Sequence, residues 1–469
     1  MQLLNTLSNK CEGKYVFFVI GFICFLGIVE THFLLNSLSR GLELKYIITG
    51  SCVILSLTFI FTRPYLGIII FFILSYFLSP EIFGKSKSLL VSLGGENLLH
   101  IVIITIIFCW LIWMIKNREF KFVVCRQNYL IIGFLLTIII SIIFAVDKSY
   151  SWIHFVGIIR IFFIYFAIIN LITSKKYFIH LVWALILIFG IPAIKAVIEY
   201  LQHGTIYTGI GDPVWGDNNY FSQLLTMTIP LAFYLIFTSR SFLKNLILTI
   251  LCLSMITTIT ITFSRSGFMG LLTVLTIILL KSKKKFYLLP IGISLVIGLI
   301  YLLPANYKDR IHSIITYQQD ISAMGRVYAW EAGLNMVKQH PLTGVGLGNF
   351  EPLSKEYNPS LPDFLTAHNF LIHLAGECGI IGVILFLALI ITSGRDLMYL
   401  KKRFRNTSEG KWIIPLADGI EVSFCGYIIA CNFSSETYML LLYVLIGLTV
   451  SLKQIAKREI NKSEGDLND

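Results

Sequence analysis

The sequence predicts an all-α, polytopic integral membrane protein with about 12–14 transmembrane helices and one large extracytoplasmic loop. The chain has 469 residues, of which 56% are hydrophobic and 14% charged, and its mean hydropathy is +0.79. A soluble protein would carry about 25% charged residues. Repeated apolar runs of about 17–25 residues suit helices that cross a bilayer, because a helix satisfies its own backbone hydrogen bonds in lipid.

The apolar runs predict one integral membrane domain over residues 1–469, with no appended soluble domain. The first run, Tyr15 to Val29, is expected to be an uncleaved span, because no small-residue cleavage site follows it. The expected spans are 15–35, 46–62, 65–79, 98–115, 129–145, 153–172, 178–202, 218–237, 243–262, 267–281, 286–303, 379–395, 413–432 and 437–453.

Basic residues in the short turns predict the topology, since Lys and Arg are enriched on the cytoplasmic side. From residue 98 onward the basic turns all fall on one side of the expected spans, which makes both termini cytoplasmic. Residues 304–378 then form the large extracytoplasmic loop. Four basic residues disagree with the first three spans as drawn: Arg40, Lys45, Lys85 and Lys87.

The net charge of +12 does not predict nucleic-acid binding, because the basic residues lie mainly in these turns. The nine cysteines contain no CxxC pair, and most lie inside apolar runs. Neither a disulfide framework nor a metal site is therefore expected.

The large loop is expected to be ordered. Residues 321–339 predict an amphipathic helix along the membrane face, ended by Pro341. Three glycines, of which Gly346 is the central one, then allow tight turns, and residues 351–364 are expected to form an irregular segment. The apolar stripe of the helix consists of Met324, Val327, Tyr328, Trp330, Leu334 and Val337.

Four cations at similar outer depth predict an anionic ligand. Arg265 occupies a short outer turn, where it is either a snorkelling arginine or a clamp for phosphate or diphosphate. Arg326 lies in the large loop, where the alternative is a solvated side chain. Arg160 and Lys195 lie in the outer halves of spans, but Lys195 precedes Glu199 by four residues and an internal ion pair is its alternative.

Polar residues near these cations supply the remaining candidates. His368 could take a proton from a hydroxyl nucleophile, with a structural role as the alternative. Asp217 and Asn219 lie at a span end, where they either cap the following helix or bind a ligand. Asn369 and Glu377 also lie at the outer side, whereas Asp418 and Glu421 are expected to be structural.

A longer motif joins these residues: Gly325-Arg326, Trp330, the run from His340 to Phe350, Ala367-His368-Asn369 and Glu377, with the arginine turn at Ser264-Arg265-Ser266-Gly267. The motif resembles the signature of the O-antigen ligase/polymerase superfamily over about residues 150–395. The resemblance implies a bacterial inner-membrane glycosyltransferase that uses an undecaprenyl-diphosphate-linked glycan, by inverting transfer without a metal or other cofactor. It also implies that His368 activates the acceptor hydroxyl and that Arg265 and Arg326 hold the diphosphate.

A narrower pattern, around Arg63-Pro64 and at Gly216-Asp217-Asn218-Asn219, resembles the exosortase-associated O-glycosylation ligase branch. The acceptor stays open among lipid A core, a second glycan and a protein. The expected function is ligase-like transfer, and the first alternative is a repeat-unit polysaccharide polymerase. The second alternative is a lipid-linked glycan flippase or transporter, which the single enlarged loop disfavours.

Overall fold

The computed structural model describes residues 63–77, 102–112, 122–204, 218–282 and 321–465, and every regular element in these ranges is a helix. The predicted all-α class is therefore confirmed. The chain separates into two compact units, residues 1–121 and residues 122–469. The expectation of a single integral membrane domain stays a prediction.

The described residues of the first unit form two short apolar helices, α4 (Pro64–Phe77) and a helix at Val102–Ile112. Pro64 begins α4, where a proline is tolerated because the first turn of a helix has no carbonyl partner for its N–H groups. The helix at Val102–Ile112 falls within the expected span 98–115, and α4 begins one residue before the expected span 65–79. The expected spans 15–35, 46–62 and 286–303 lie outside the described residues.

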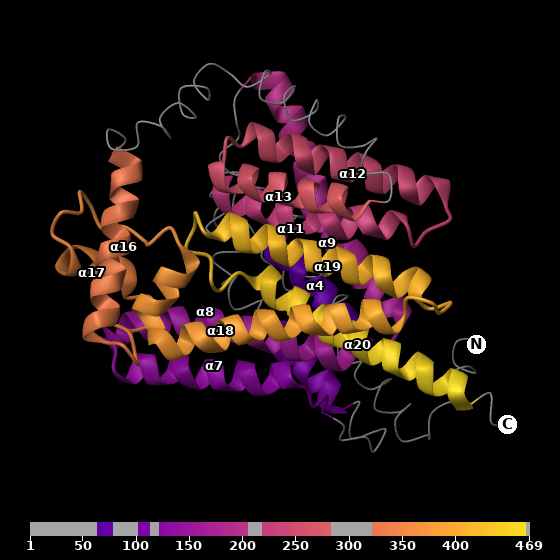
Figure 1. Cartoon of the computed structure of the whole chain (residues 1–469), viewed down its shortest axis with the longest axis horizontal. Helices are drawn as coiled ribbons and strands as arrows, with labels where there is room; N and C mark the ends of the chain where they lie inside the picture. Colours follow the sequence, from indigo (N-terminus) through magenta and orange to yellow (C-terminus); the bar gives the residue numbers. More distant parts are fainter. Residues whose placement is uncertain (1–62, 78–101, 113–121, 205–217, 283–320, 466–469) are drawn as a thin grey trace, which may run out of the picture. The chain divides into compact units, whose positions relative to one another are not determined.

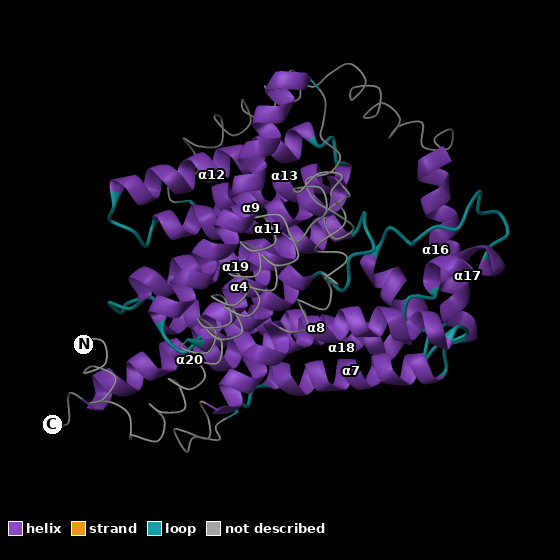
Figure 2. Ribbon diagram, turned by 180° about the vertical axis from the view of Figure 1, so that it is seen from behind, coloured by secondary structure: helices purple, strands orange, loops and turns teal. Residues whose placement is uncertain are grey.

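The second unit holds the remaining helices (Figures 1 and 2). Seven of the described helices are long and apolar enough to cross a membrane: α7, α8, α9, α12, α18, α19 and α20. The bounds are α7 (Arg126–Ile143), α8 (Lys148–Leu171), α9 (Lys175–His203), α11 (Asn218–Ile236), α12 (Phe242–Ile261), α13 (Arg265–Lys281), α16 (Ile321–Gln339), α17 (Phe350–Tyr357), α18 (Phe370–Arg403), α19 (Gly410–Cys431) and α20 (Leu440–Gly465).

Helix α11 lies inside this unit, where it contacts α9, α12, α13 and α19. Its residues 221–232 are buried on all sides, including the polar Ser222, Gln223, Thr226 and Thr228. Helix α12 shows the opposite distribution, because it exposes large apolar side chains such as Phe242 and Leu243. Apolar residues outside and hydrogen-bonded polar residues inside are what a lipid environment favours.

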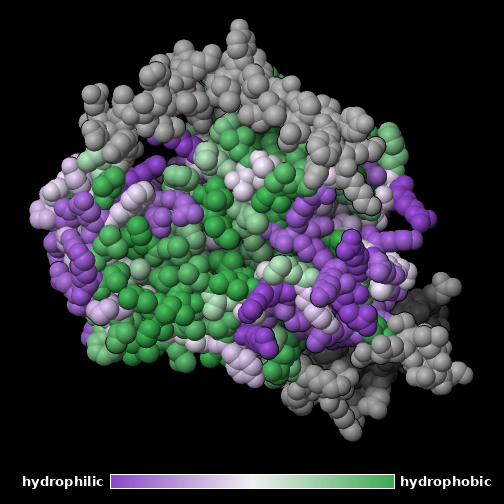
Figure 3. All heavy atoms as spheres, viewed as in Figure 1, coloured by the Kyte–Doolittle hydropathy of each residue, from purple (hydrophilic) through white to green (hydrophobic). Residues whose placement is uncertain are grey.

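The surface of the molecule agrees with a multi-pass membrane protein. Figure 3 shows a broad hydrophobic surface over α7 and α18, with hydrophilic surfaces near α16 and α17 and near the far ends of α18 and α19. Exposed apolar residues on α7 and α18 include Ile132, Leu136, Ile139, Ile380 and Ile384.

The basic turns gather at one end of the second unit. The guanidinium of Arg458 donates to the carbonyl of Thr173 at 3.1 Å, and the Lys175 ammonium lies 4.8 Å from the Trp412 ring. Lys281 and Lys401 both pair with Asp418 and Glu421 at the same end. The turns that precede α9 and α19 and the end of α20 therefore lie together, which is the arrangement that the basic-turn pattern predicts.

Helix α16 runs crosswise to α7 and α18 beyond their other end (Figures 1 and 2). Its bounds match the predicted helix, and it stops before Pro341. The predicted stripe is wrong in part, because Leu334 is 53% exposed. The side of α16 that packs inward carries small residues instead, at Gly325, Ala329 and Ala332, followed by Met336.

Two further boundaries differ from the sequence prediction. Helix α17 occupies residues 350–357, where an irregular segment was expected, and its start at Phe350 is fully buried. Helix α18 starts at Phe370 and not near residue 379, and it continues across a kink at Gly379. The residues before the kink are therefore helical, which places Glu377 on a helix and not in a loop.

Candidate functional site

The turn between α12 and α13 carries Arg265, the first residue of α13, with a half-buried side chain. Ser264 caps this helix, because its hydroxyl accepts the Gly267 N–H at 3.1 Å. The same hydroxyl donates to Asn219 Oδ1 at 2.8 Å. The residue before the cap, Phe263, has φ 51°, which is uncommon outside glycine.

Buried polar side chains connect the Arg265 turn to the end of α19. Ser266 Oγ accepts a hydrogen bond from Gln223 Nε2 at 3.2 Å, and Gln223 Oε1 accepts one from the Cys431 thiol at 3.6 Å. Helices α11, α13 and α19 are in contact along this path. The turn is thereby held against the last residue of α19.

The turn that contains His368 meets α19 at the same end. Asn369 caps α18, since its side-chain oxygen accepts the N–H groups of Leu371 and Ile372 at 3.0 and 3.1 Å. Its Nδ2 donates to Asn432 Oδ1 at 3.3 Å, and Asn432 follows Cys431 directly. His368 has φ 48°, and its N–H donates to Ser435 Oγ at 2.9 Å. The structure thus brings the Arg265 and His368 turns to one end of α19.

The side of α16 that carries Trp330 faces the segment that leads into His368. The Trp330 indole N–H donates to the Ala367 carbonyl at 2.7 Å, one residue before His368. Arg326 lies four residues before Trp330, so the two side chains share one side of the helix. A Cβ atom at the neighbouring Gly325 would lie 3.1 Å from Leu365. The Arg326 side of α16 therefore packs against the segment that leads into His368.

The glycine loop is hydrogen-bonded to the kink in α18. Gly379 has φ 70° and ψ −177°, so the helical pattern is interrupted there. The N–H groups of Val345 and Gly346 donate to the carbonyls of Gly376 and Glu377 at 2.8 and 3.2 Å. Gly346 has φ 112°, and a Cβ atom there would lie 2.4 Å from Ala145 Cβ. Both the backbone angle and the close approach require glycine at Gly346.

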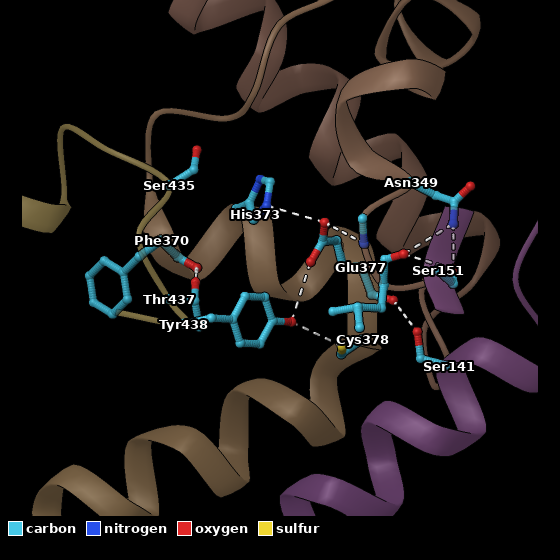
Figure 4. A network of polar contacts seen from close by, with 12 residues as sticks. Ser141, Ser151, Asn349, Phe370, His373, Glu377, Cys378, Ser435, Thr437 and Tyr438 are labelled. Atoms are coloured by element: carbon cyan, nitrogen blue, oxygen red, sulfur yellow. Dashed lines mark hydrogen bonds and ion pairs between the residues drawn. The ribbon is translucent and has the colours of Figure 1, made fainter. Parts of the chain in front are cut away.

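A buried carboxylate joins the loop to two other segments (Figure 4). Glu377 is 2% exposed, and its Oε1 accepts the Gly348 N–H at 2.9 Å and lies 3.2 Å from His373 Nε2. Its Oε2 accepts the Tyr438 hydroxyl at 3.3 Å. Burial raises the pKa of Tyr438 well above its ordinary value, so the phenol stays protonated and remains a donor. Glu377 therefore connects the glycine loop to α18 and to Tyr438.

Residues 250–387 match the family model described as O-antigen ligase. This segment belongs to the O-antigen ligase/polymerase superfamily. A comparison with curated proteins finds no match for the chain.

The O-antigen ligase segment contains Arg265, Arg326, His368 and Glu377. Side chains from outside it hydrogen-bond to two of these residues, since Ser435 accepts from His368 and Tyr438 donates to Glu377. Others bond to residues beside Arg265 and His368: Asn219 to Ser264, Gln223 to Ser266, and Asn432 to Asn369. The matched residues of the superfamily are therefore held in place by helices on both sides of the match.

Some predicted site residues lie apart from these turns. Lys195 is 53% exposed and its ammonium lies 3.5 Å from Glu199, so the pair with Glu199 forms but Lys195 is not inside the bundle. Arg160 is half-buried on α8, and a Cβ atom at Gly157 would lie 3.5 Å from its Nη2. The hydrogen bonds described above reach neither residue. Asp217 lies outside the described residues.

Sequence reasoning passed over three residues that hold the site: His373, Ser435 and Tyr438. A signal existed for His373, because it precedes Glu377 by four residues in a stretch that proves to be helical. Ser435 and Tyr438 lie more than 60 positions from their partners, at separations of 67 and 61 residues. No local pattern could have identified those two.

Proposed function

We propose that the protein transfers a glycan from an undecaprenyl-diphosphate-linked donor to an acceptor hydroxyl, on the outer side of the bacterial inner membrane. One observation carries this proposal: the Arg265 turn and the His368 turn meet at the end of α19 that lies away from the basic turns. An arginine that binds phosphate and a histidine that accepts protons are the two groups that such a transfer needs.

The orientation follows from the basic turns. Since Lys and Arg favour the cytoplasmic side, the end with Lys175, Lys281 and Lys401 is assigned to the cytoplasm. Both termini are then cytoplasmic, and residues 304–378 lie outside. The crosswise run of α16 supports a position along the outer membrane face for this helix.

In the proposed mechanism, the donor's diphosphate binds Arg265 and Arg326. Guanidinium groups bind phosphate oxygens in pairs of hydrogen bonds and stabilise the negative charge that develops on the leaving group. We assign the diphosphate to these two arginines and not to Lys195, because Glu199 already neutralises that ammonium. Arg160 remains an additional candidate from its position on α8.

His368 is the proposed general base. Its imidazole takes the proton of the acceptor hydroxyl while the oxygen attacks the anomeric carbon from the face opposite the diphosphate. A new C–O bond forms, and the bond to the diphosphate breaks with its electron pair leaving on the lipid diphosphate. The anomeric centre is inverted. No step requires a metal or an oxidant, so we propose a metal-independent reaction without a cofactor.

The testing experiment is transfer by purified protein in detergent. The donor is an undecaprenyl-diphosphate glycan, and the acceptors are lipid A core, the same glycan and a peptide, each assayed with EDTA present. A product that forms with wild-type protein and not with His368→Ala supports the proposal. The acceptor that yields a product shows whether the protein is a ligase or a polymerase. Absence of product with every acceptor, together with glycan movement across liposomes, would replace the proposal by a flippase.

A further inference from the structure

The connection between α19 and α20, residues 432–438, contacts the start of α18 repeatedly. We call it the α19–α20 connection. Each contact is a hydrogen bond between segments that lie 60 or more residues apart in the sequence. In order along the connection, the bonded pairs are Asn432 with Asn369, Ser435 with His368, Thr437 with Phe370, and Tyr438 with Glu377 and Cys378.

These contacts are well placed to control the backbone around His368. The Ser435 hydroxyl accepts the His368 N–H at 2.9 Å, and the Thr437 hydroxyl donates to the Phe370 carbonyl at 2.9 Å. Thr437 and Phe370 are buried, so a lost partner there would not be replaced easily by water. Hydrogen bonds thus hold the backbone on both sides of Asn369.

The α19–α20 connection is itself held from both neighbouring helices. On the α19 side, the Tyr427 hydroxyl donates to the Glu436 carbonyl at 2.9 Å, and Asn432 Nδ2 donates to the Ile428 carbonyl at 2.7 Å. On the α20 side, the Tyr443 hydroxyl donates to the Thr437 carbonyl at 3.5 Å. Tyr427 and Tyr443 are fully buried, which makes the connection a rigid support rather than a free loop.

His368 needs such a support because of its backbone. A non-glycine residue with φ 48° costs free energy and persists only where its surroundings hold it. If the backbone relaxed to an ordinary φ, the hydrogen bond from the His368 N–H to Ser435 would break. Without it, the backbone can leave the left-handed region and carry the imidazole with it.

We infer that the α19–α20 connection positions His368 for catalysis, with Ser435 as the positioning residue. The inference rests on the proposed role of His368 as the general base. It assigns a function to a segment that the O-antigen ligase match does not reach, since that match ends at residue 387. Ser435 acts through the histidine backbone and not on the substrates.

The test compares Ser435→Ala with Ser435→Thr in the detergent transfer assay. Ser435→Ala removes the acceptor of the His368 N–H, and a displaced base is expected to lower kcat by about 10- to 100-fold. The KM for the lipid-linked donor should stay within about twofold, because the arginines are untouched. Ser435→Thr keeps a hydroxyl and should restore most of kcat. Ser393→Ala is the matched control, since this buried serine bonds to Leu389 within α18 and should leave kcat unchanged.

Two further results separate this inference from the proposed function. Combined with His368→Ala, the Ser435→Ala change should cause no additional loss, because both act on one group. Wild-type kcat in Ser435→Ala beside an inactive His368→Ala would overturn the positioning role and leave the function standing. Full activity in His368→Ala would overturn the histidine's role itself. A Ser435→Ala defect that appears only in KM or in thermal unfolding, without rescue by threonine, would also overturn the inference.

Discussion

The two ends of α13, α18 and α19 are built from different interactions. At one end, Lys281 on α13 and Lys401 on α18 pair with Asp418 and Glu421 on α19, with the Lys401–Glu421 contact at 2.6 Å. At the other end, the same helices are joined by hydrogen bonds of Asn, Ser, Gln and Cys side chains. Ion pairs hold the helices together at one end, and hydrogen bonds between largely neutral side chains do so at the other.

The backbone differs between the ends in the same way. Within the described residues, the non-glycine residues with positive φ are Phe263 and His368, and each lies in one of the two turns at the neutral end. Strained residues are retained where the surrounding contacts impose them, and they are frequent at functional sites. We infer that the charged end stabilises the bundle, whereas the neutral end fixes the geometry of the proposed site.

The largest expected effect is at His368. Replacing it by alanine removes the proposed base, and general bases contribute about 10²- to 10⁴-fold to rate. We expect His368→Ala to lose transfer activity by this order while its thermal unfolding in detergent matches the wild type. Glycan transfer at the wild-type level would show that this end of the molecule does not carry the base.

The second-largest loss of turnover is expected at Arg265. Removal of one charge-stabilising donor typically costs about 10²- to 10³-fold in turnover, and we expect this loss for Arg265→Ala. Arg265→Lys should recover part of it, since an ammonium keeps the charge but not the paired donors. Arg403→Ala provides the control, because this exposed arginine ends α18 at the charged end. Equal losses in both variants would remove the distinction between the two ends.

Glu377 should affect both stability and turnover. Glu377→Ala leaves the Gly348 N–H and the Tyr438 hydroxyl without their buried acceptor, at a cost of about 1–3 kcal/mol for each unsatisfied group. We expect a lower thermal midpoint and a loss of turnover by about tenfold, because the glycine loop shifts. Glu377→Gln keeps one oxygen acceptor and should be milder in both measurements. An unchanged midpoint in Glu377→Ala would contradict the anchoring role.

The smallest effect on turnover is expected at the charged end. The double variant Asp418→Asn, Glu421→Gln leaves two lysines without counter-charges, and for these partly buried pairs we expect a loss of about 1–3 kcal/mol in stability. The folded fraction should transfer glycan within about twofold of the wild-type rate, since no proposed site residue is involved. A large fall in the rate per folded molecule would connect the charged end to the reaction.

Much of the helical framework could be predicted from hydrophobicity alone. Apolar runs identified α7, α8, α9 and α12 to within a few residues, because a bilayer selects length and polarity so strongly. The start of α18 was missed, although Asn369 is a favoured capping residue. The stripe on α16 was misassigned because close packing, and not hydrophobicity, decides that side: a Cβ atom at Gly333 would lie 2.5 Å from Ile372 Cγ2.

The candidate site could be predicted only where a residue type was unusual for its position. An arginine in an outer turn and a histidine before a span drew attention to Arg265 and His368. Ser435 is an ordinary residue in a short connection, and its proposed role comes from a contact across 67 residues. Long-range contacts of this kind follow from how helices pack, which a single sequence does not specify residue by residue.

The α19–α20 connection follows, in the order of synthesis, the start of α18 that it contacts. Membrane helices are inserted as the chain is synthesised, and earlier segments fold first. The Arg265 turn, α16 and the glycine loop are therefore made before Ser435 exists to accept the His368 N–H. A nascent chain that has not yet delivered α19 and α20 already carries both proposed arginines but lacks the support of its base. In this order of synthesis, the proposed base gains its support only after α19 and α20 have been made.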